Sequence, residues 1–176
     1  MIAAMASEAR EYVGYDPNLA LQPCYRMIEK TFSSQVPEMS CRVHPRPFEE
    51  FQGPPYDLVF TSPPYYNLEM YSRDPGQSTE TWPLWGDWKS RWYEPFLQQC
   101  WSAVRPGGFL ALYVENFTYD QRIYPLEDIT RTEMERLGAP SPHHLGLLVH
   151  AGSEGKKRPV VRWCHVWRKN ESKDTH

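Results

Sequence analysis

Cysteine pairs, long apolar runs and a basic charge balance are all missing from this sequence of 176 residues. The four cysteines are widely scattered and form no C-x-x-C pair, which excludes the usual zinc-site spacings and indicates buried thiols in a reducing compartment. No apolar run reaches about 18 residues, and the first residues lack the pattern of a secretory signal. We therefore expect a cytoplasmic or nuclear protein that is not secreted and binds neither membrane nor metal.

The net charge of -3 provides no general attraction for nucleic acid, although a local groove is still compatible with it. Basic residues are concentrated in the last part of the chain, where residues 153–176 contain seven Lys or Arg against three acids. Two interpretations stay open for this region. It is either a solvated strand and tail or a strip that contacts phosphates.

Glycine is sparse, with ten residues, whereas proline is abundant, with 17 residues, and aromatic residues make up 14% of the chain. The hydrophobic content of 40% is that of an ordinary soluble protein. This length supports one domain with a real core, and a second full domain is not expected. The prolines gather in connecting segments, so we expect a single globular domain, 1–176, with long and stiff loops.

Short apolar strands alternate with amphipathic helices along the chain, which favours a mainly parallel sheet covered on both faces. The last two strands resemble an antiparallel hairpin, and we expect frayed ends at 1–9 and 170–176. The predicted strands are 11–15, 40–44, 57–61, 109–114, 145–149 and 160–167, and the predicted helices are 19–32, 87–104 and 126–137.

The segment Thr61-Ser62-Pro63-Pro64-Tyr65 follows the most apolar predicted strand. In open α/β sheets, ligands bind beyond the carboxyl ends of the strands. Two successive prolines hold the backbone extended and leave carbonyl acceptors without N–H donors. The Ser62 hydroxyl and the Pro63 carbonyl are therefore suited to accept the two N–H bonds of an aromatic amine, and Tyr65 is suited to stack on its ring.

This segment resembles the (S/D/N)PP(Y/F) motif of S-adenosylmethionine-dependent amino-methyltransferases, in the TSPPY form typical of DNA cytosine-N4 enzymes. The resemblance implies an α/β fold with a Rossmann-like class I methyltransferase sheet, mostly parallel and with an antiparallel C-terminal hairpin. It also implies S-adenosyl-L-methionine as cofactor and a DNA base, flipped out or in a single strand, as target. The catalytic residues that it implies are Ser62, Pro63, Pro64 and Tyr65.

A second segment, Val-Gly-Tyr-Asp-Pro-Asn at 13–18, resembles the second-strand motif of the same enzymes. There an acid beyond the strand binds the ribose hydroxyls of the cofactor, a role that falls on Asp16 by position, and Asp16 is also a candidate helix cap. The cofactor-binding residues implied by the resemblance are Asp16, Pro17, Asn18 and Thr61.

The glycine-rich cofactor loop of this family normally precedes that second strand, and no G-x-G pattern stands before Glu11. We therefore expect the sheet to lack its first strand. The chain is then a fragment or truncated product, a degenerate homologue, or a protein whose cofactor site a second chain completes.

Target recognition is expected in an insertion at 66–92, which contains aromatic residues and a few cations, as stacking on unpaired bases requires. Trp88 and Trp92 are expected to pack the following helix into the core instead. The residues expected to contact the target are Tyr66, Asn67, Tyr71 and Arg73.

Methylation of a DNA exocyclic amine, with cytosine N4 favoured, is the function that the sequence predicts. Two alternatives stay open. One is a non-catalytic subunit with a methyltransferase fold that binds nucleic acid or a partner chain. The other is methylation of adenine N6, of an RNA base or of a glutamine side chain, which Ser62 disfavours.

Overall fold

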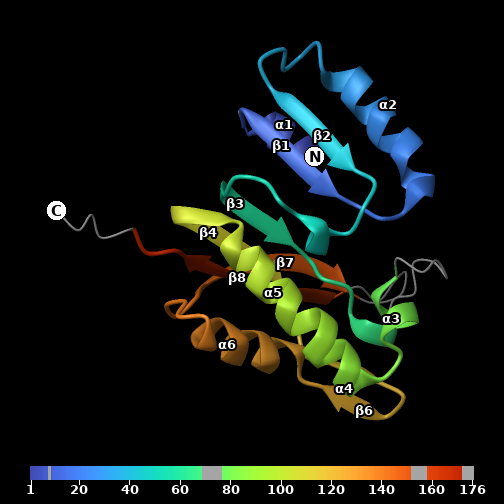
Figure 1. Ribbon diagram of the computed structural model, residues 1–176, viewed down its shortest axis with the longest axis vertical. Helices are drawn as coiled ribbons and strands as arrows, with labels where there is room; N and C mark the ends of the chain where they lie inside the picture. Colours follow the sequence, from blue (N-terminus) through green and yellow to red (C-terminus); the bar gives the residue numbers. More distant parts are fainter. Residues whose placement is uncertain (8, 69–76, 152–157, 172–176) are drawn as a thin grey trace. The chain divides into compact units, whose positions relative to one another are not determined.

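The computed structural model describes residues 1–7, 9–68, 77–151 and 158–171, which form two compact units (Figure 1). The first unit contains Met1–Phe51 and Tyr71–Pro83, and the second contains Gln52–Met70 and Leu84–His176. Among these described residues, no helix has the length and apolar character needed to cross a membrane.

The first unit is built on two parallel strands joined by a helical crossover. β1 (Glu11–Tyr15) and β2 (Ser40–His44) pair along their whole length and have the predicted bounds. The predicted helix over 19–32 is instead a single 3-10 turn followed by an α-helix, in which a proline stands in the first turn as expected. The other elements are η1 (Leu19–Leu21), α2 (Gln22–Phe32), η2 (Phe48–Glu50) and α3 (Ser78–Thr81).

Few side chains of the first unit are buried. Met5 in α1 (Ile2–Ala6) is one of them, so the expectation of a frayed end over 1–9 is wrong for this helix. Phe51 is another, and its ring lies edge-on to Tyr15 at a centroid distance of 5.9 Å. α2 contributes no buried residue. This unit therefore has a thin core with few buried side chains.

The second unit contains a four-stranded sheet in the order β3-β4-β8-β7. β3 pairs with β4 in parallel, whereas β8 runs antiparallel to both β4 and β7. The antiparallel hairpin predicted for the last two strands is confirmed, with both strands longer than expected. The bounds are β3 (Tyr56–Thr61), β4 (Val104–Tyr113), β7 (His143–Ala151) and β8 (Arg158–Arg168).

One face of this sheet carries the core. The register places Leu110 opposite Trp167 and Leu112 opposite His165, and all four residues are buried. α5 (Glu94–Ser102) packs on β4 and on α6 (Leu126–Arg136), which also lies against this face (Figure 1). α6 ends at Arg136, one residue before the predicted end, and the predicted terminator Gly138 follows with φ of +75°.

The opposite face of the same sheet exposes large apolar side chains. Leu58 and Phe60 on β3 are 57% and 65% exposed, and both stand on the face opposite Leu110 and Leu112. The expectation of a sheet covered on both faces is therefore wrong for the described residues, because both covering helices lie on one side. The exposed large apolar residues of this face are Leu58, Phe60, Phe109, Leu145, Leu147 and Val160.

The helix predicted over 87–104 runs through three consecutive segments and ends two residues earlier. They are α4 (Trp85–Asp87), a π-helical stretch η4 (Trp88–Tyr93) and α5. The predicted stop at Arg-Pro-Gly-Gly is already part of β4. A Cβ on Gly108 would stand 2.8 Å from the Asp57 carbonyl oxygen, so this glycine allows the two strands to approach where their register shifts.

A short hairpin in the second unit escaped prediction. β5 (Phe117–Tyr119) and β6 (Arg122–Tyr124) are antiparallel and are joined by Asp120 and Gln121. Both turn residues have positive φ, of 46° and 58°, which suits a tight hairpin turn. A pair of three-residue strands has too little periodicity to stand out in a sequence.

Candidate active site

The Ser-Pro-Pro-Tyr segment begins where β3 ends. Thr61 is the last residue of that strand and pairs with Leu112. Ser62 is exposed, whereas the ring of Pro63 is almost completely buried. Since each proline restricts the residue before it to extended conformations, the chain leaves the sheet without starting a helix. The buried proline thus anchors a loop that presents the Ser62 hydroxyl at the surface.

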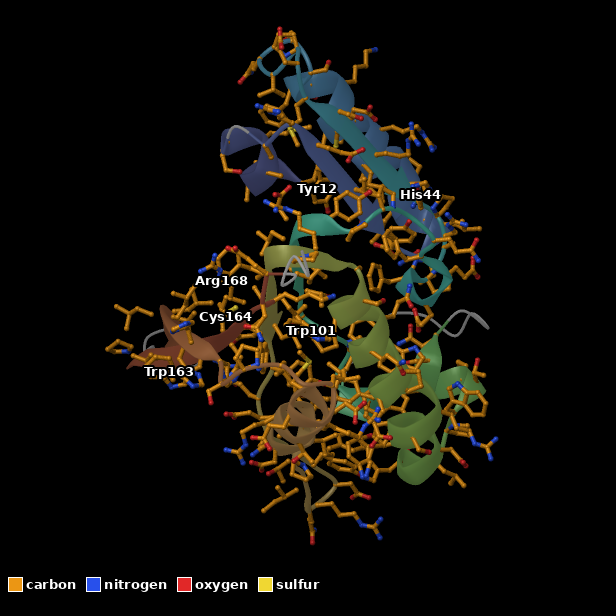
Figure 2. The ribbon with its side chains drawn as sticks, turned by 60° about the vertical axis from the view of Figure 1, so that its left-hand side comes forward. Tyr12, His44, Trp101, Trp163, Cys164 and Arg168 are labelled. Carbon is orange, nitrogen blue, oxygen red and sulfur yellow. The ribbon has the colours of Figure 1, made fainter. Side chains whose placement is uncertain are left out.

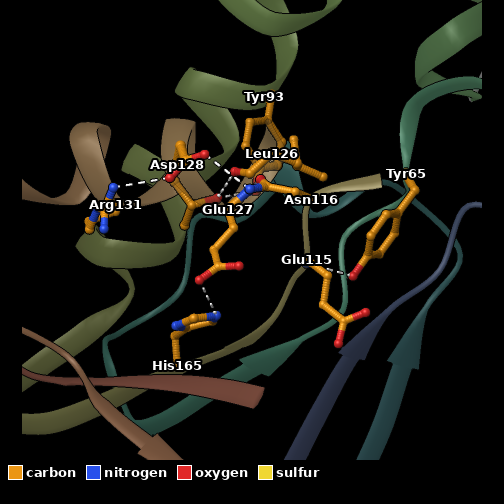
Figure 3. Close-up of polar contacts among 10 residues, drawn as sticks. Tyr65, Tyr93, Glu115, Asn116, Leu126, Glu127, Asp128, Arg131 and His165 are labelled. Atoms are coloured by element: carbon orange, nitrogen blue, oxygen red, sulfur yellow. Dashed lines mark hydrogen bonds and ion pairs between the residues drawn. The ribbon is translucent and has the colours of Figure 1, made fainter. Parts of the chain in front are cut away.

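Tyr65 is fixed by a contact that is distant in sequence. Its hydroxyl accepts a hydrogen bond from the backbone N–H of Glu115 at 3.0 Å, just past the end of β4 (Figure 3). Its ring stands edge-on to Phe117, with centroids 5.5 Å apart. Burial, together with the nearby Glu115 carboxylate, raises the pKa of Tyr65. The phenol therefore stays neutral, and its ring has a defined position.

The residue after Tyr65 lies in an aromatic cluster. Tyr66 is only 5% exposed, and its ring contacts Trp85, Trp88 and Tyr124 at centroid distances of 5.4 to 5.6 Å. Its φ of +43° is in the left-handed region, which costs a bulky side chain free energy. Complete burial of Trp88 confirms its expected role in the core.

The expected target contacts are therefore placed only in part. Tyr66 points into the cluster, and a contact between it and a base stays a prediction. Asn67, in η3 (Tyr66–Leu68), is half-buried and hydrogen-bonded to Tyr66. Tyr71 and Arg73 lie outside the described residues.

The segment after β4 carries an ion pair next to the Tyr65 contact. The Glu115 carboxylate accepts a hydrogen bond from Arg162 Nη1 at 2.9 Å, and the same nitrogen lies 3.3 Å from the Tyr113 hydroxyl. The Tyr113 hydroxyl and the Glu115 charge raise the pKa of Arg162. Three polar residues from β4, its extension and β8 thus form one connected group.

Asp16, in the first unit, lies just beyond the end of β1. Its carboxylate accepts hydrogen bonds from the backbone N–H of Asn18, at 2.8 Å, and from the Tyr25 hydroxyl. Asn18, rather than Asp16, caps the following 3-10 turn by accepting the N–H of Ala20 at 3.0 Å. A carboxylate has about four lone-pair sites, so two sites of Asp16 are left for a ligand.

A small cavity in the second unit contains a buried histidine. His165 is 5% exposed, and its Nε2 has no hydrogen-bond partner among the described residues. The nearest carboxylate oxygen is Glu127 Oε1, at 3.6 Å (Figure 3). Burial lowers the pKa of His165, against the opposing effect of Glu127. The cavity has a volume of about 160 Å³ and is lined by Val114, Glu127, Thr130, Arg131, Ser141, Pro142, His144, His165 and Trp167.

Three basic residues near the C-terminus are engaged by groups of the protein. Lys169 Nζ donates to the carbonyls of Trp101 and Val104, both at 2.8 Å, and so stabilises the end of α5. Arg162 pairs with Glu115, and Arg168 pairs with Glu171. The described part of the chain contains no group of three or more His, Cys, Asp or Glu residues able to hold a metal ion.

The sequence patterns did not single out Glu115 or Arg162 as site residues. A signal for Glu115 was present, because polar residues directly after a buried strand are candidates by the same rule that selected Ser62. Arg162 had no such signal, since it lies in the middle of a strand and meets Glu115 only through the register of β4 and β8.

Two solved structures share the architecture of this chain. A SAM-dependent methyltransferase from Methanosarcina mazei matches with a TM-score of 0.53 at 9% identity, over 97% of this chain and 87% of that one. A SAM-dependent O-methyltransferase from Thermotoga maritima gives 0.51 at 12% identity, over 93% of this chain and 51% of that one. The fold is that of the SAM-dependent methyltransferases.

The fold class implied by the motif is therefore confirmed, while the chain spans about half the length of the Thermotoga protein. A putative DNA modification methylase from Thermus thermophilus has a TM-score of 0.48 at 17% identity, over 70% of this chain and 50% of that one, which is too low a likeness to bear on function. No protein-family model and no curated protein match the sequence.

Proposed function

We propose that this chain transfers a methyl group from S-adenosyl-L-methionine to an exocyclic amine of a DNA base, with cytosine N4 as the favoured target. The observation that supports this most is the placement of Ser62-Pro63-Pro64-Tyr65 directly after a parallel strand of a methyltransferase fold. The exposed serine and the fixed tyrosine fit the resemblance to the amino-methyltransferase motif.

The chemistry required of these residues is positioning. The lone pair of an aromatic amine is delocalised into its ring, so the nitrogen is a poor nucleophile. Ser62 Oγ and the Pro63 carbonyl accept hydrogen bonds from the two N–H groups of the amine and draw its nitrogen toward a tetrahedral geometry. Tyr65 stacks on the base, and the nitrogen is held for in-line attack, which supplies much of the rate. The methylated nitrogen then loses one proton to water.

The cofactor would supply an electrophilic methyl group on a sulfonium, and the S–CH3 bond would break as the N–C bond forms, with S-adenosylhomocysteine as the leaving group. On the chain, Asp16 is proposed to hold its ribose hydroxyls, with Pro17 and Asn18 next to it after β1. Thr61, the last residue of β3, is proposed separately as a cofactor contact of the second unit. The fit rests on the free lone pairs of Asp16 and on the two hydrogen bonds that orient its carboxylate.

Target contact is proposed for the segment that follows the motif. Asn67 is partly accessible, whereas Tyr66 supports the segment from inside the aromatic cluster. Tyr71 and Arg73 remain candidates for base stacking and phosphate contact.

A non-catalytic subunit of a larger assembly is the second candidate function. The supporting observation is the exposed apolar face of the sheet, with Leu58, Phe60 and Leu145 more than half exposed. Several exposed apolar side chains on one sheet face favour a contact with another protein. A second chain placed on this face is compatible with either function.

Calorimetry with S-adenosylhomocysteine, followed by a methyl-transfer assay on cytosine- and adenine-containing oligonucleotides, tests the proposal. We expect binding, and a fall in kcat of about 100-fold or more for Ser62→Ala and Tyr65→Ala with little loss of cofactor affinity. Ser102→Ala, an exposed serine at the end of α5, is the matched control. Absence of both binding and transfer would reject the enzyme and favour the subunit, and product analysis separates cytosine from adenine.

A further inference from the structure

The link from the motif to the rest of the second unit passes through one peptide group. The N–H of Glu115 donates to the Tyr65 hydroxyl at 3.0 Å, across 50 residues of sequence. This is the hydrogen bond that defines where the phenol ring stands, since the opposing contact with Phe117 is an edge-on ring contact at 5.5 Å. The position of Tyr65 thus depends on the position of the Glu115 backbone.

That backbone lies beyond the paired part of its strand. The last register pair between β4 and β8 is Tyr113 with Cys164, two residues before Glu115. What reaches Glu115 from β8 is the side chain of Arg162, whose Nη1 donates to the Glu115 carboxylate at 2.9 Å. The same nitrogen is 3.3 Å from the Tyr113 hydroxyl, so the guanidinium joins the end of β4 to its extension.

The ion pair between Arg162 and Glu115 is less exposed than the pair between Arg105 and Asp57. The side chains of Arg162 and Glu115 are 39% and 30% exposed, whereas those of the Arg105–Asp57 pair are 52% and 81% exposed. Exposed ion pairs contribute little to stability, because water screens the charges and because long side chains lose entropy when they are ordered. Arg162 contacts two acceptors, and one of them belongs to Glu115, the residue that binds the Tyr65 hydroxyl. Among the described residues, the Arg105–Asp57 pair has no such connection to the motif.

We infer that Arg162 is a positioning residue for the methyl-transfer site, which holds the Glu115 N–H beneath the Tyr65 hydroxyl through its ion pair with the Glu115 carboxylate. The inference rests on the proposed function, because the motif must be catalytic for its position to matter. Arg162 itself acts only through Glu115 and Tyr65. Strand β8 thereby controls a loop that begins two strands away, at the end of β3.

Kinetics of Arg162→Met test the inference. We expect kcat to fall about 10- to 100-fold with the KM for S-adenosylmethionine unchanged, since small displacements of positioned groups have effects of this size. Glu115→Gln keeps the N–H but weakens the ion pair, and it should reproduce part of the loss. Arg162→Lys should recover part of the rate. Arg105→Met, at the other end of β3 and β4, is the matched control and should retain full rate.

A double-mutant cycle separates positioning from a general structural role. Tyr65→Phe removes the hydroxyl on which Arg162 is proposed to act. Adding Arg162→Met to Tyr65→Phe should then lower kcat less than about twofold, because interacting sites are not additive. Full additivity of the two losses would overturn the inference.

Amide hydrogen exchange at Glu115 in the whole chain, without cofactor or DNA, makes the two failures distinguishable. We expect faster exchange at this amide in both Arg162→Met and Tyr65→Phe, and unchanged exchange in Arg105→Met. If the wild-type chain transfers no methyl group but this pattern is found, the proposed function fails while the link from Arg162 to Tyr65 stands. Unchanged exchange at Glu115 in Arg162→Met refutes the link, whatever the activity.

Discussion

The loops that follow β1 and β3 are held in different ways. In the first unit, Asp16 is braced by Asn18 and Tyr25, which lie two and nine residues further along the chain. In the second unit, Tyr65 is held by Glu115, 50 residues away. A loop fixed by local bonds needs little tertiary structure, whereas a loop fixed across the sheet depends on the packing of the whole unit.

The cores of the two units differ in the same direction. The second unit buries large side chains completely, among them Trp88, Tyr93 and Leu97, while α2 of the first unit buries none. On β8, Trp163 is exposed and its neighbour Cys164 is buried, so even the well-packed unit has an open part (Figure 2). The loop that contains Ser62 and Tyr65 is therefore supported by a well-packed core, whereas the loop that contains Asp16 is held by hydrogen bonds.

The largest expected effect is that of Trp88→Ala. Removing a fully buried indole should lower the free energy of unfolding of the second unit by about 3–5 kcal/mol. Met27→Ala on α2, 64% exposed in the wild type, should change stability by about 0.5 kcal/mol or less. Urea titrations followed by circular dichroism measure both. Equal losses in the two variants would remove the contrast between the cores.

A smaller effect is expected from Tyr25→Phe in the first unit. This variant removes the hydrogen bond to Asp16 and should lower the free energy of unfolding of the first unit by about 1 kcal/mol. The loss is smaller than that of a buried hydrogen bond to a charged group, because Tyr25 and Asp16 are partly exposed. Amide exchange in β1 reports the local loss. Tyr119→Phe, on the exposed β5, is the control. Should exchange in β1 stay unchanged, local bonds do not hold the Asp16 loop.

Acid should destabilise the second unit through His165. Its pKa in the folded protein is lowered by burial, although Glu127 opposes the shift and His144 adds to it. The unfolded chain therefore takes up the proton first, and the stability that is present above about pH 6.5 falls as the pH decreases below that value.

Unfolding measured between pH 7.5 and 5.5 should show a shallower pH dependence for His165→Gln than for the wild type. His44→Gln in the first unit should change the slope less, since His44 is only partly buried, and its pKa is lowered by that burial together with Arg46 and Arg42. A steeper slope in His165→Gln would contradict the assigned direction.

The smallest effect is expected from Arg105→Met. The pair between Arg105 Nε and Asp57 Oδ1 is short, at 2.7 Å, but both side chains are more than half exposed. Its loss should change the free energy of unfolding by about 0.5 kcal/mol or less. A larger change in thermal or urea unfolding would show that this exposed pair makes a substantial contribution to the stability of β3 and β4.

Local sequence patterns were sufficient to locate the two strands of the first unit to the residue, the antiparallel hairpin of the second, and Ser62-Pro63-Pro64-Tyr65 at a strand end. Apolar alternation, proline and capping residues act over about ten residues, so they can be read from neighbours alone. The fold class followed from the motif and was confirmed by the structure.

Long-range packing settled which sheet face is covered, so Leu58 and Phe60 are exposed although their strand is predicted to be buried. It also directed the ring of Tyr66 toward the aromatic cluster that includes Trp88, and it brought the Arg162 side chain within hydrogen-bond distance of Glu115. These contacts join residues about 20 to 50 positions apart, and they depend on strand register and on which side the helices pack. No local pattern carries that information, because the same strand sequence suits either arrangement.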